Sequence, residues 1–402
     1  MALMPVADAL ARVLADAMPL PAETVPLHAA LGRVLAEDLA ARRTQPPDAV
    51  SAMDGYAVRA TDVTQAPVTL TVIGEVAAGH PFEGEVGAGQ AARIFTGGVM
   101  PDGSDTVVIQ ELTARDGDAV TIQKPTAASR NVRAKGIDFT QGDTLLRRGR
   151  CLTDRDLMLA AAMNFPQFDV HRQPKVAILG TGDELVMPGR TPGPGEIVYS
   201  NGFALTALAH SEGAKVSDLG IAHDKIDAIV ACVRQARAQG VDILVTSGGA
   251  SVGDHDLVQQ ALRAEGLDLS FWRVALRPGR PMMHGRLGDM HVLGLPGNPV
   301  SSYVCAFLFL APLIRKLAGR ADIERTPERA LLGRDLPAND ERADYLRATL
   351  EQGPDGPVAT PVPAQDSSLM AALAGADCLV IRPPGAPAAE AGSPCTILKL
   401  AF

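Results

Sequence analysis

The sequence predicts a multidomain α/β protein: a doubly wound parallel-sheet domain with an N-terminal helical region, an inserted β module and a C-terminal β-barrel-like domain. Three observations support this fold class. From residue 175, apolar runs of strand length alternate with segments of helix length, as in a parallel sheet covered by helices on both faces. Residues 43–138 contain short β-prone runs between Gly, Pro and Asp turns. Residues 328–402 are rich in Pro and Gly and contain further β-prone runs.

The composition restricts the classes of function. With 402 residues, 47% hydrophobic and 21% charged, the chain is expected to be globular and to form several domains. A net charge of −9 argues against broad nucleic-acid binding but not against a small anionic ligand. The five cysteines are scattered without a CxxC pair, which indicates reduced thiols in a cytoplasmic protein. Residues 1–17 lack signal-peptide features and the apolar stretch 300–313 is short for a bilayer, so we expect a soluble protein without a membrane partner.

The first half of the chain predicts a β module inserted into a helical domain. Residues 5–18 and 27–39 each place apolar side chains on one helical face, so we expect two opening helices. Helical character returns at residues 153–163, where Thr153 and Asp156 match a capping box. The expected strands of the module are 68–73, 92–95, 106–110 and 119–122. The predicted bounds are 1–44 with 139–170 for the helical domain and 45–138 for the module.

The second half predicts the α/β domain, residues 171–319, and then the C-terminal β domain, residues 320–402. The expected strands of the α/β domain are 176–179, 216–221, 241–245, 273–276 and 291–295, and its expected helices are 201–212, 226–239, 256–265 and 300–317. The expected strands of the C-terminal domain include 345–350, 378–381 and 396–400. Ligands of doubly wound sheets bind beyond the carboxyl ends of the strands, so the loops at that edge are the candidate site.

The segment ILVTSGGASVGDHD, residues 243–256, is the most informative part of the chain. An apolar strand ends there in small residues, and a helix follows. Such a loop leaves unpaired backbone N–H groups at a helix N-terminus, which favours negative charge. Gly248 and Gly249 let an anion approach the backbone because they have no Cβ atom. Carboxylates after the loop can hold a divalent cation against a phosphate. An ordinary glycine-rich turn is the alternative to a site for an anionic, phosphorylated ligand.

Three carboxylates are expected at the same edge of the sheet: Glu184 in the GTGDE loop, Asp224, and Asp256. Taken singly, Asp183, Asp224 and Asp256 could each be a helix cap. Taken together beside a phosphate-type loop, carboxylates repel one another unless a cation or a cationic partner is present. The set therefore predicts either a divalent cation or cationic side chains at this edge.

Cationic side chains follow another strand of the predicted sheet. The segment WRVALRPGRP places Arg273, Arg277 and Arg280 on and just after that strand. A guanidinium offers a fixed fork of donors that fits tetrahedral oxyanions, and it stays charged. The alternative is that these arginines are ordinary solvent-exposed surface residues, although the prolines, which stiffen this turn, disfavour it. The pattern favours an oxyanion-binding role.

Three further motifs carry weaker signals. LPGNP enters the last helix of the α/β domain with Asn298 as a candidate N-cap and Pro299 at the helix start, and its backbone N–H groups face the same edge. In the β module, Asp54 lies in SAMDGYA, where Asp-Gly is a turn signal, and Thr96 lies in RIFTGG. Each of these is more typical of structure than of function when taken alone.

The motifs SAMDGYAVR, RIFTGG with MPDGSDTVV, VAILGTGDEL, TSGGASVGDHD, RPGRP and LPGNPVS occur in this order. Together they resemble the MoeA-type molybdopterin molybdenumtransferase family, related to the E domain of gephyrin, over residues 5 to 400. The resemblance implies a transferase of molybdenum cofactor biosynthesis whose α/β domain is of the molybdopterin-binding type. It implies that molybdate is inserted into adenylylated molybdopterin with Mg²⁺-dependent release of AMP. It also implies elongated homodimers of four domains that share the active cleft between subunits.

The resemblance assigns roles by motif match. The catalytic residues would be Asp54, Thr96, Glu184, Asp224, Asp256, Arg277 and Arg280. The substrate and its phosphates would bind to Ser247, Gly248, Gly249, Ser251, Gly253, Arg273, Gly279, Pro296, Gly297, Asn298 and Pro299. Molybdate would contact Arg347, Ser367 and Ser368, and Mg²⁺ would bind to Glu184, Asp224 and Asp256. The family commonly has lysines where this chain has Arg277 and Arg280, so a broad planar fork replaces a compact ammonium group.

Two alternatives stay open at this point. One is a molybdopterin adenylyltransferase-like nucleotide enzyme, although that family usually lacks the extra domains and the motif around Asp54. The other is a cofactor carrier or scaffold without turnover, which the full set of acidic residues disfavours. The resemblance further implies a molybdopterin adenylyltransferase and molybdoenzyme chaperones as protein partners. Molybdate and tungstate differ little in size and charge, so either oxyanion fits this interpretation.

Overall fold

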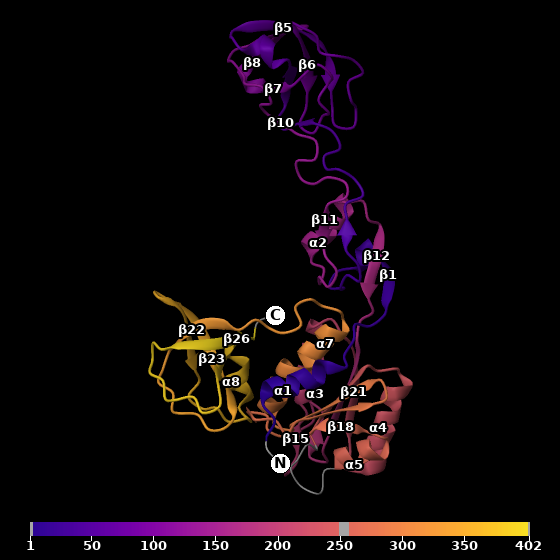
Figure 1. Ribbon diagram of the computed structural model, residues 1–402, viewed down its shortest axis with the longest axis vertical. Coiled ribbons are helices and arrows are strands. Elements are labelled where there is room, and N and C mark those ends of the chain that lie inside the picture. Colours follow the sequence, from indigo (N-terminus) through magenta and orange to yellow (C-terminus); the bar gives the residue numbers. More distant parts are fainter. Residues whose placement is uncertain (1–2, 249–256, 401–402) are drawn as a thin grey trace.

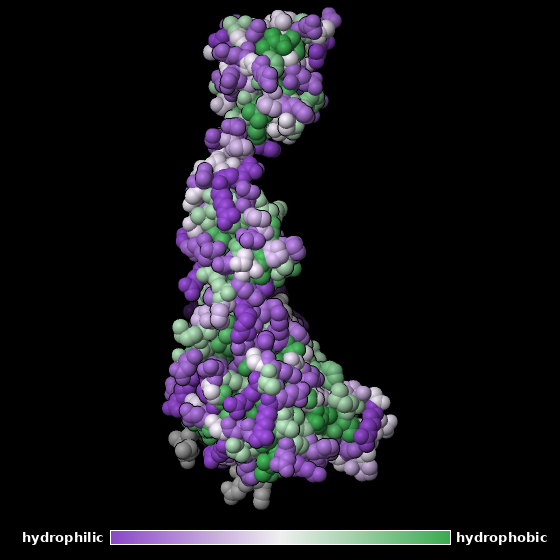
Figure 2. All heavy atoms as spheres, turned by 90° about the vertical axis from the view of Figure 1, so that its right-hand side faces the viewer, coloured by the Kyte–Doolittle hydropathy of each residue, from purple (hydrophilic) through white to green (hydrophobic). Residues whose placement is uncertain are grey.

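The computed structural model describes residues 3–248 and 257–400. The described chain is elongated, with a β module at one end and, at the other, an α/β domain beside the C-terminal domain (Figure 1). Figure 2 shows the same extended outline and a narrow, largely hydrophilic connection below the β module. This shape keeps the two ends of the molecule far apart.

The α/β domain is built on a six-stranded sheet. Its order is β16 (Lys215–Ala222), β13 (Lys175–Thr181), β17 (Ile243–Ser247), β21 (Met290–Leu295), β20 (Met283–Leu287) and β18 (Asp268–Phe271). The first four strands pair in parallel and the last two pair antiparallel, so the sheet is mixed. Separate hydrophobic clusters cover its two faces, one containing Val176 and Ile178 and the other containing Ala177 and Leu179. The alternation follows from the period of two along a strand that is buried on both faces.

Helices cover both faces of this sheet, as predicted. They are α3 (Asn201–Ser211), α4 (Ile226–Ala238), α5 (Leu257–Ala264), α6 (Pro299–Cys305) and α7 (Ala311–Leu317), with the π-helical turn η4 (Ala306–Leu310) between the last two. The continuous helix Pro299–Leu317 is 19 residues long and apolar enough to span a membrane by length and composition alone. However, 89% of the apolar window is buried inside the fold, which is typical of a core helix.

The prediction of a strand of this sheet at residues 273–276 is wrong. The sheet positions at this edge belong instead to β18 and β20, and the short strand β19 (Leu276–Arg277) pairs in parallel with β23 (Ala343–Gly353) of the C-terminal domain. The reason is that hydrophobic pattern indicates an extended segment but not which sheet will supply its hydrogen bonds.

The prediction of two opening helices is half right. The first helix is α1 (Val6–Ala15), and it packs against α7 and η4 in the core of the α/β domain. The second helix, expected at 27–39, is wrong: only the 3₁₀ turn η1 (Leu27–Ala29) and the short strand β2 (Leu39–Ala40) form there. Gly32 has a φ of +72°, which a helix cannot accommodate. Leu35 is buried in the same hydrophobic cluster as Val170, and the backbones of the two residues form a β-bridge.

The middle region combines chain from both sides of the β module. β1 (Ala22–Pro26) pairs with β12 (Gln167–His171), and β2 pairs with β11 (Thr144–Leu146). The helix α2 (Asp154–Ala162) begins with the predicted capping box, in which Thr153 and Asp156 bond reciprocally. One hydrophobic cluster joins Val25, Leu39, Phe139 and Phe168. Residues before 45 and after 138 therefore share a core.

The β module is a six-stranded sheet with hydrophobic clusters of its own. Its order is β7 (Thr106–Ile109), β4 (Gly55–Val58), β6 (Gln90–Ile94), β5 (Val68–Val76), β9 (Ala119–Ile122) and β8 (Thr113–Asp116). The chain enters and leaves through the antiparallel pair β3 (Val50–Ser51) and β10 (Val132–Arg133).

The C-terminal domain is a closed barrel, which confirms the predicted barrel-like unit. Its strands are β23, β24 (Gly356–Pro361), β22 (Glu328–Leu332), β26 (Pro394–Lys399) and β25 (Cys378–Arg382), and β25 pairs back onto β23. The short helix α8 (Met370–Ala374) and the loop before it contact the N-terminal part of α6. The barrel thus supplies one wall of the candidate site.

Candidate functional site

A pocket of about 760 Å³ lies at the carboxyl ends of β13, β17 and β21, where doubly wound sheets bind ligands. Its walls include the small strands β14 (Leu185–Val186) and β15 (Ile197–Val198), and part of the C-terminal domain. The expected site residues that line it are Glu184, Ser247, Gly248, Pro296, Gly297, Asn298, Pro299 and Ser368. Three separate loops of the α/β domain and one loop of the barrel therefore meet there.

The start of the anion loop requires glycine. Gly248 has a φ of +101°, and a Cβ atom on it would lie 2.3 Å from the backbone oxygen of Thr181. Its N–H donates to the Leu295 oxygen at 3.4 Å, so the loops after β13, β17 and β21 are in contact. The remaining expected loop residues, Gly249, Ser251, Gly253 and Asp256, lie outside the described residues.

Two buried hydroxyl groups in the pocket wall have no hydrogen-bond partner among the described residues. They are Thr181 Oγ1 and Tyr199 OH. Burial raises the pKa of Tyr199 and keeps its phenol neutral. Gly180 and Gly202 make room for this side chain. A Cβ atom on Gly180 would lie 2.5 Å from the ring of Tyr199, and one on Gly202 would lie 2.0 Å from its hydroxyl oxygen. Buried polar groups are normally hydrogen-bonded, so these two unpaired hydroxyls in the pocket wall are exceptions.

Asp183 connects the two acidic loops at the edge of the sheet. Its Oδ1 accepts hydrogen bonds from His223 Nδ1 at 2.9 Å and from the Asp224 backbone N–H at 3.2 Å. These contacts, with the histidine contributing most, lower the pKa of Asp183. Asp224 is not the cap of α4, because Lys225 occupies that position without a side-chain bond. Asp183 and Asp224 thus form a loop–loop contact rather than the helix caps considered as alternatives.

Glu184 and Asp224 are exposed carboxylates on neighbouring loops. Their oxygen atoms are the type of ligand that Mg²⁺ prefers. Within residues 3–248 and 257–400, however, no three His, Cys, Asp or Glu side chains are grouped closely enough to hold a metal ion. The third expected ligand, Asp256, lies outside the described residues.

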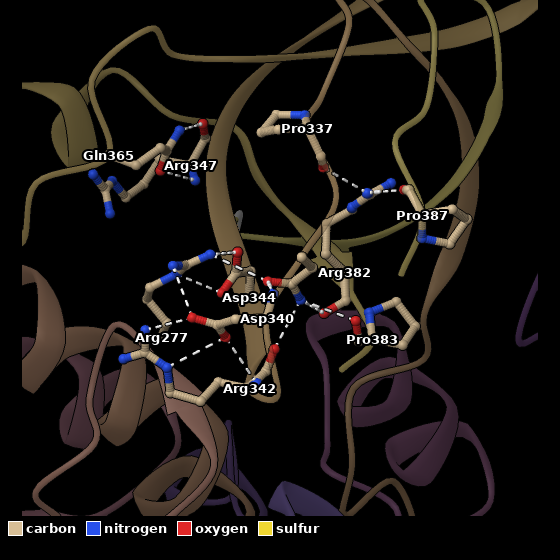
Figure 3. Close-up of polar contacts among 11 residues, drawn as sticks. Arg277, Pro337, Asp340, Arg342, Asp344, Arg347, Gln365, Arg382, Pro383 and Pro387 are labelled. Atoms are coloured by element: carbon tan, nitrogen blue, oxygen red, sulfur yellow. Dashed lines mark hydrogen bonds and ion pairs between the residues drawn. The ribbon is translucent and has the colours of Figure 1, made fainter. Parts of the chain in front are cut away.

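The three arginines of the RPGRP region differ in their surroundings. Arg277 Nε donates to Asp344 Oδ1 at 2.7 Å and its Nη2 bonds Oδ2 of the same residue, while Nη1 reaches Asp340 Oδ2 at 3.3 Å (Figure 3). The bond to Asp344 is the main cause that raises the pKa of Arg277. Arg280 is exposed next to Pro281, which lines the pocket, and Arg273 is half-buried beside Trp272. Arg277 therefore ties the α/β domain to the barrel.

Gly279, between the last two arginines, serves packing. It has a φ of +120°, and a Cβ atom on it would lie 2.4 Å from Cys305 Sγ.

The barrel covers the N-terminus of α6. The Val300 N–H donates to the Ser367 oxygen at 3.1 Å, and Asn298 Nδ2 donates to Ser367 Oγ at 2.9 Å. Asn298 occupies the N-cap position, as predicted, but its side chain makes no capping bond. The N–H group of Val300 is therefore occupied by protein rather than open to a ligand.

Arg347 is a fully buried arginine beneath the same loop of the barrel. Its Nη2 donates to the backbone oxygens of Asp366 at 3.0 Å and Ala364 at 3.4 Å. Its Nε and Nη1 have no partner among the described residues, and burial lowers the pKa of the guanidinium. Asp366 in turn accepts from the N–H and hydroxyl of Ser368. A buried guanidinium with spare donors suits an oxyanion.

Asp54 and Thr96 form a pair of their own in the β module. Asp54 Oδ1 accepts from the Thr96 N–H at 2.7 Å and from its hydroxyl at 2.8 Å. These bonds, the backbone one first, lower the pKa of Asp54. The pair follows the ends of β3 and β6, at the opposite end of the molecule from the pocket (Figure 1). A single chain does not bring these residues to the other site residues.

Models of three known protein regions match the chain in sequence. They are the MoeA N-terminal region (domain I and II) at residues 4–164, a probable molybdopterin binding domain at 177–316, and the MoeA C-terminal region (domain IV) at 329–400. The chain belongs to the MoeA family. The family assignment suggested by the six motifs is confirmed, and so is the multidomain α/β fold class.

Individual MoeA proteins match over most of the chain. The molybdopterin molybdenumtransferase of Haemophilus influenzae is 34% identical over 91% of this chain and 91% of its own length. The protein of that name from Nostoc is 41% identical over 74% of this chain and 70% of its own. The crystal structure of the molybdopterin biosynthesis MoeA protein from Pyrococcus horikoshii OT3 has a TM-score of 0.85 at 29% identity, covering 99% of this chain and 100% of that one.

Sequence reasoning did not single out three pocket residues that the structure makes prominent, namely Thr181, Tyr199 and Asn201. It considered Asp183 only as a helix cap and missed its contact between loops, which lies outside the pocket lining. Thr181 ends β13, Asp183 follows that strand, and Tyr199 and Asn201 lie at the start of α3, so all four are at the carboxyl edge of the sheet. That edge position was the available signal, whereas the unpaired hydroxyls and the loop contacts required coordinates.

Proposed function

We propose that this chain is a transferase of molybdenum cofactor biosynthesis that inserts molybdate into adenylylated molybdopterin and releases AMP. The observation that carries the proposal is the pocket in which the glycine loop at Gly248, the LPGNP loop and Ser368 of the barrel meet. Such a pocket offers backbone and hydroxyl donors to phosphates on one wall and an oxyanion-binding barrel loop on the other.

The residue roles follow from the motif match. Ser247 and Ser368 line the pocket, whereas the arginines and Ser367 lie outside its lining. The loop from Ser247 onward binds the phosphates of the substrate. Arg347, which has two nitrogen atoms without a partner in the described part of the chain, and the hydroxyls of Ser367 and Ser368 hold molybdate. Arg273 and Arg280 neutralise charge that develops on the departing phosphate. Arg277 contributes to the site by holding the barrel against the α/β domain through its bond to Asp344.

Mg²⁺ is assigned to Glu184, Asp224 and Asp256. When bound, it supplies positive charge that polarises a phosphoanhydride and offsets phosphate charge. The protein contributes the placement of these carboxylates, since Asp183 holds the Asp224 backbone beside the Glu184 loop. Among the described residues Asp183 pairs with His223, whereas Glu184 and Asp224 form no ion pair, so these two carboxylates fit a site completed by a cation.

We further propose a homodimer in which each active site is shared. Asp54 and Thr96 lie too far along the elongated chain to reach the pocket of their own subunit, so a second chain must supply them (Figure 1). The division into residues 1–44 with 139–170, 45–138, 171–319 and 320–402 belongs to this proposal. The proposal also includes a cytoplasmic location and two kinds of protein partner. A molybdopterin adenylyltransferase would supply the substrate, and molybdoenzyme chaperones would receive the product.

The direct test combines purified protein with adenylylated molybdopterin, Mg²⁺ and molybdate, and measures AMP together with active cofactor. Molybdate-dependent AMP release matched by cofactor formation is the expected result, and a parallel reaction with tungstate establishes the choice of oxyanion. Binding of the adenylate without AMP release would instead support a carrier or scaffold. Adenylylation of molybdopterin from ATP would support the adenylyltransferase-like alternative.

Shared sites have a separate test by subunit mixing. Asp54→Ala and Glu184→Ala are each expected to inactivate the homodimer. After unfolding and refolding a mixture, half of the dimers contain both variants and each of these has one intact site, so roughly a quarter of wild-type activity returns. A mixture that stays inactive while wild-type protein regains activity in the same procedure would show that the sites are not shared.

A further inference from the structure

The side-chain amide of Asn201 joins two loops of the pocket. Its Nδ2 donates to Ser247 Oγ at 2.8 Å, at the end of β17, and to the Gly297 backbone oxygen at 2.8 Å, in the loop after β21. An amide nitrogen carries two hydrogen atoms, so these two bonds use its full donor capacity. Both the position and the orientation of the amide are thereby fixed.

The two loops that Asn201 joins are in contact with each other. A Cβ atom on Gly297 would lie 3.7 Å from the Cα atom of Gly248. On the far side, Ser247 Oγ lies 3.4 Å from Ser302 Oγ on α6, and both serines are buried. One continuous polar chain therefore runs from the start of α3 through β17 to α6.

Helix capping does not explain the placement of this amide. The N-cap of α3 is Ser200, which makes no capping bond with its side chain, and Asn201 is the first residue of the helix. Its side chain bonds to two other loops instead of to its own helix. Asn201 lines the pocket beside Tyr199 and Pro299, within reach of a ligand held by either loop.

We propose that Asn201 is a positioning residue that holds the start of the anion loop against the LPGNP loop and so preorganises the phosphate site. The inference rests on the proposed function and names a residue of the same pocket. A loop ordered before binding loses less conformational entropy when the anion arrives, so the benefit appears as ligand affinity.

The experiment measures AMP binding by titration calorimetry in the presence of Mg²⁺ for the wild-type protein and for Asn201→Ala, Asn201→Asp and Ser247→Ala. Asn201→Ala removes two neutral hydrogen bonds and is expected to weaken AMP binding about tenfold. Asn201→Asp keeps the shape but places a carboxylate against the Gly297 oxygen and beside the ligand, so its loss should be larger. The matched control is Gln173→Ala. It removes the hydrogen bond of 2.9 Å that Gln173 Nε2 donates to the Gly213 oxygen, which lies away from the pocket.

The double variant Asn201→Ala with Ser247→Ala separates positioning from general stability. If Asn201 acts through Ser247, the loss of affinity in the double variant is smaller than the product of the two single losses. Unchanged AMP affinity in Asn201→Ala, a loss equal to that of Gln173→Ala, or strictly multiplicative losses would overturn the inference. A wild-type protein that does not bind AMP would overturn the proposed function itself, which is a different result.

Discussion

Replacing Arg277 by lysine tests how the barrel is fixed to the α/β domain. Arg277 makes two bonds to Asp344 and one each to Asp340 and Asn339, and its backbone pairs with Asp344 through β19 and β23. The Asp344 side chain is 6% exposed, whereas that of Arg277 is 44% exposed. A lysine carries one compact ammonium group, so it reaches one carboxylate at a time and loses the forked contact.

The size of the effect follows from these exposures. A hydrogen bond to a charged group is worth about 1.5–3 kcal/mol when buried, and solvent around the arginine reduces this value. We expect Arg277→Lys to lower the free energy of unfolding of this part of the protein by about 2 kcal/mol. Arg277→Ala should cost more, about 3 kcal/mol, because it leaves the buried Asp344 carboxylate without a guanidinium.

The assay is urea unfolding followed by tryptophan fluorescence. The chain has one tryptophan, Trp272, which lies five residues before Arg277 and therefore reports on this region. The matched control is Arg190→Lys, because Arg190 forms an exposed ion pair with Glu196 at 3.3 Å and should change stability by less than about 0.5 kcal/mol. If Arg277→Lys and Arg190→Lys shift the unfolding midpoint equally, the interdomain role of Arg277 is refuted.

Three further outcomes are expected. Gly248→Ala should abolish AMP release while leaving the far β module folded by circular dichroism, because its Cβ would lie 2.3 Å from the Thr181 oxygen; normal activity would contradict the geometry. Burial lowers the pKa of His284 to about 4 and of His291 to about 3, so both bind fewer protons folded than unfolded. Their stabilisation is present above pH 6.5 and is lost as pH falls towards 4, by at most about 1.4 kcal/mol per pH unit for each. His291→Gln should therefore flatten the dependence of unfolding free energy on pH between 6.5 and 5, and an unchanged slope would count against this. Glu212→Gln should destabilise the α/β domain by about 3 kcal/mol in urea unfolding, because the buried carboxylate contacts three guanidinium groups; a loss below about 1 kcal/mol would show that water replaces it.

Part of the candidate site could be predicted from local sequence patterns. The strand, the glycine turn at Gly248 and the proline-led helix at Pro299 were all predictable, because each depends on neighbours in the chain. Their meeting in one pocket was also predictable, since the carboxyl ends of parallel strands share an edge. The contacts of the Asn201 amide and of the Asp183 carboxylate were missed because their partners lie 40 to 96 residues away in sequence.

Other features depended on which surfaces meet. The helix α1 matches its predicted periodicity, but the pattern does not indicate that it packs against α7 rather than beside η1. Likewise the apolar residues at 27–39 suit a helix by spacing, yet Leu35 is buried next to Val170 and forms a β-bridge with it. Periodicity records which side of a segment is apolar; the partner and even the element type are decided by packing.

The sequence alone determined the fold class, because strand and helix periods, glycine turns and capping residues act over a few positions. Its motifs identified the family by resemblance, and with it a set of candidate site residues. The tertiary structure decided where those residues lie: Arg277 pairs with Asp344, Arg347 is buried with two nitrogen atoms unpaired among the described residues, and Asp54 lies in the β module, far from Glu184. The physical reason is that ion pairing, burial and separation in space depend on the whole arrangement of domains. Such contacts form between segments that no local pattern links.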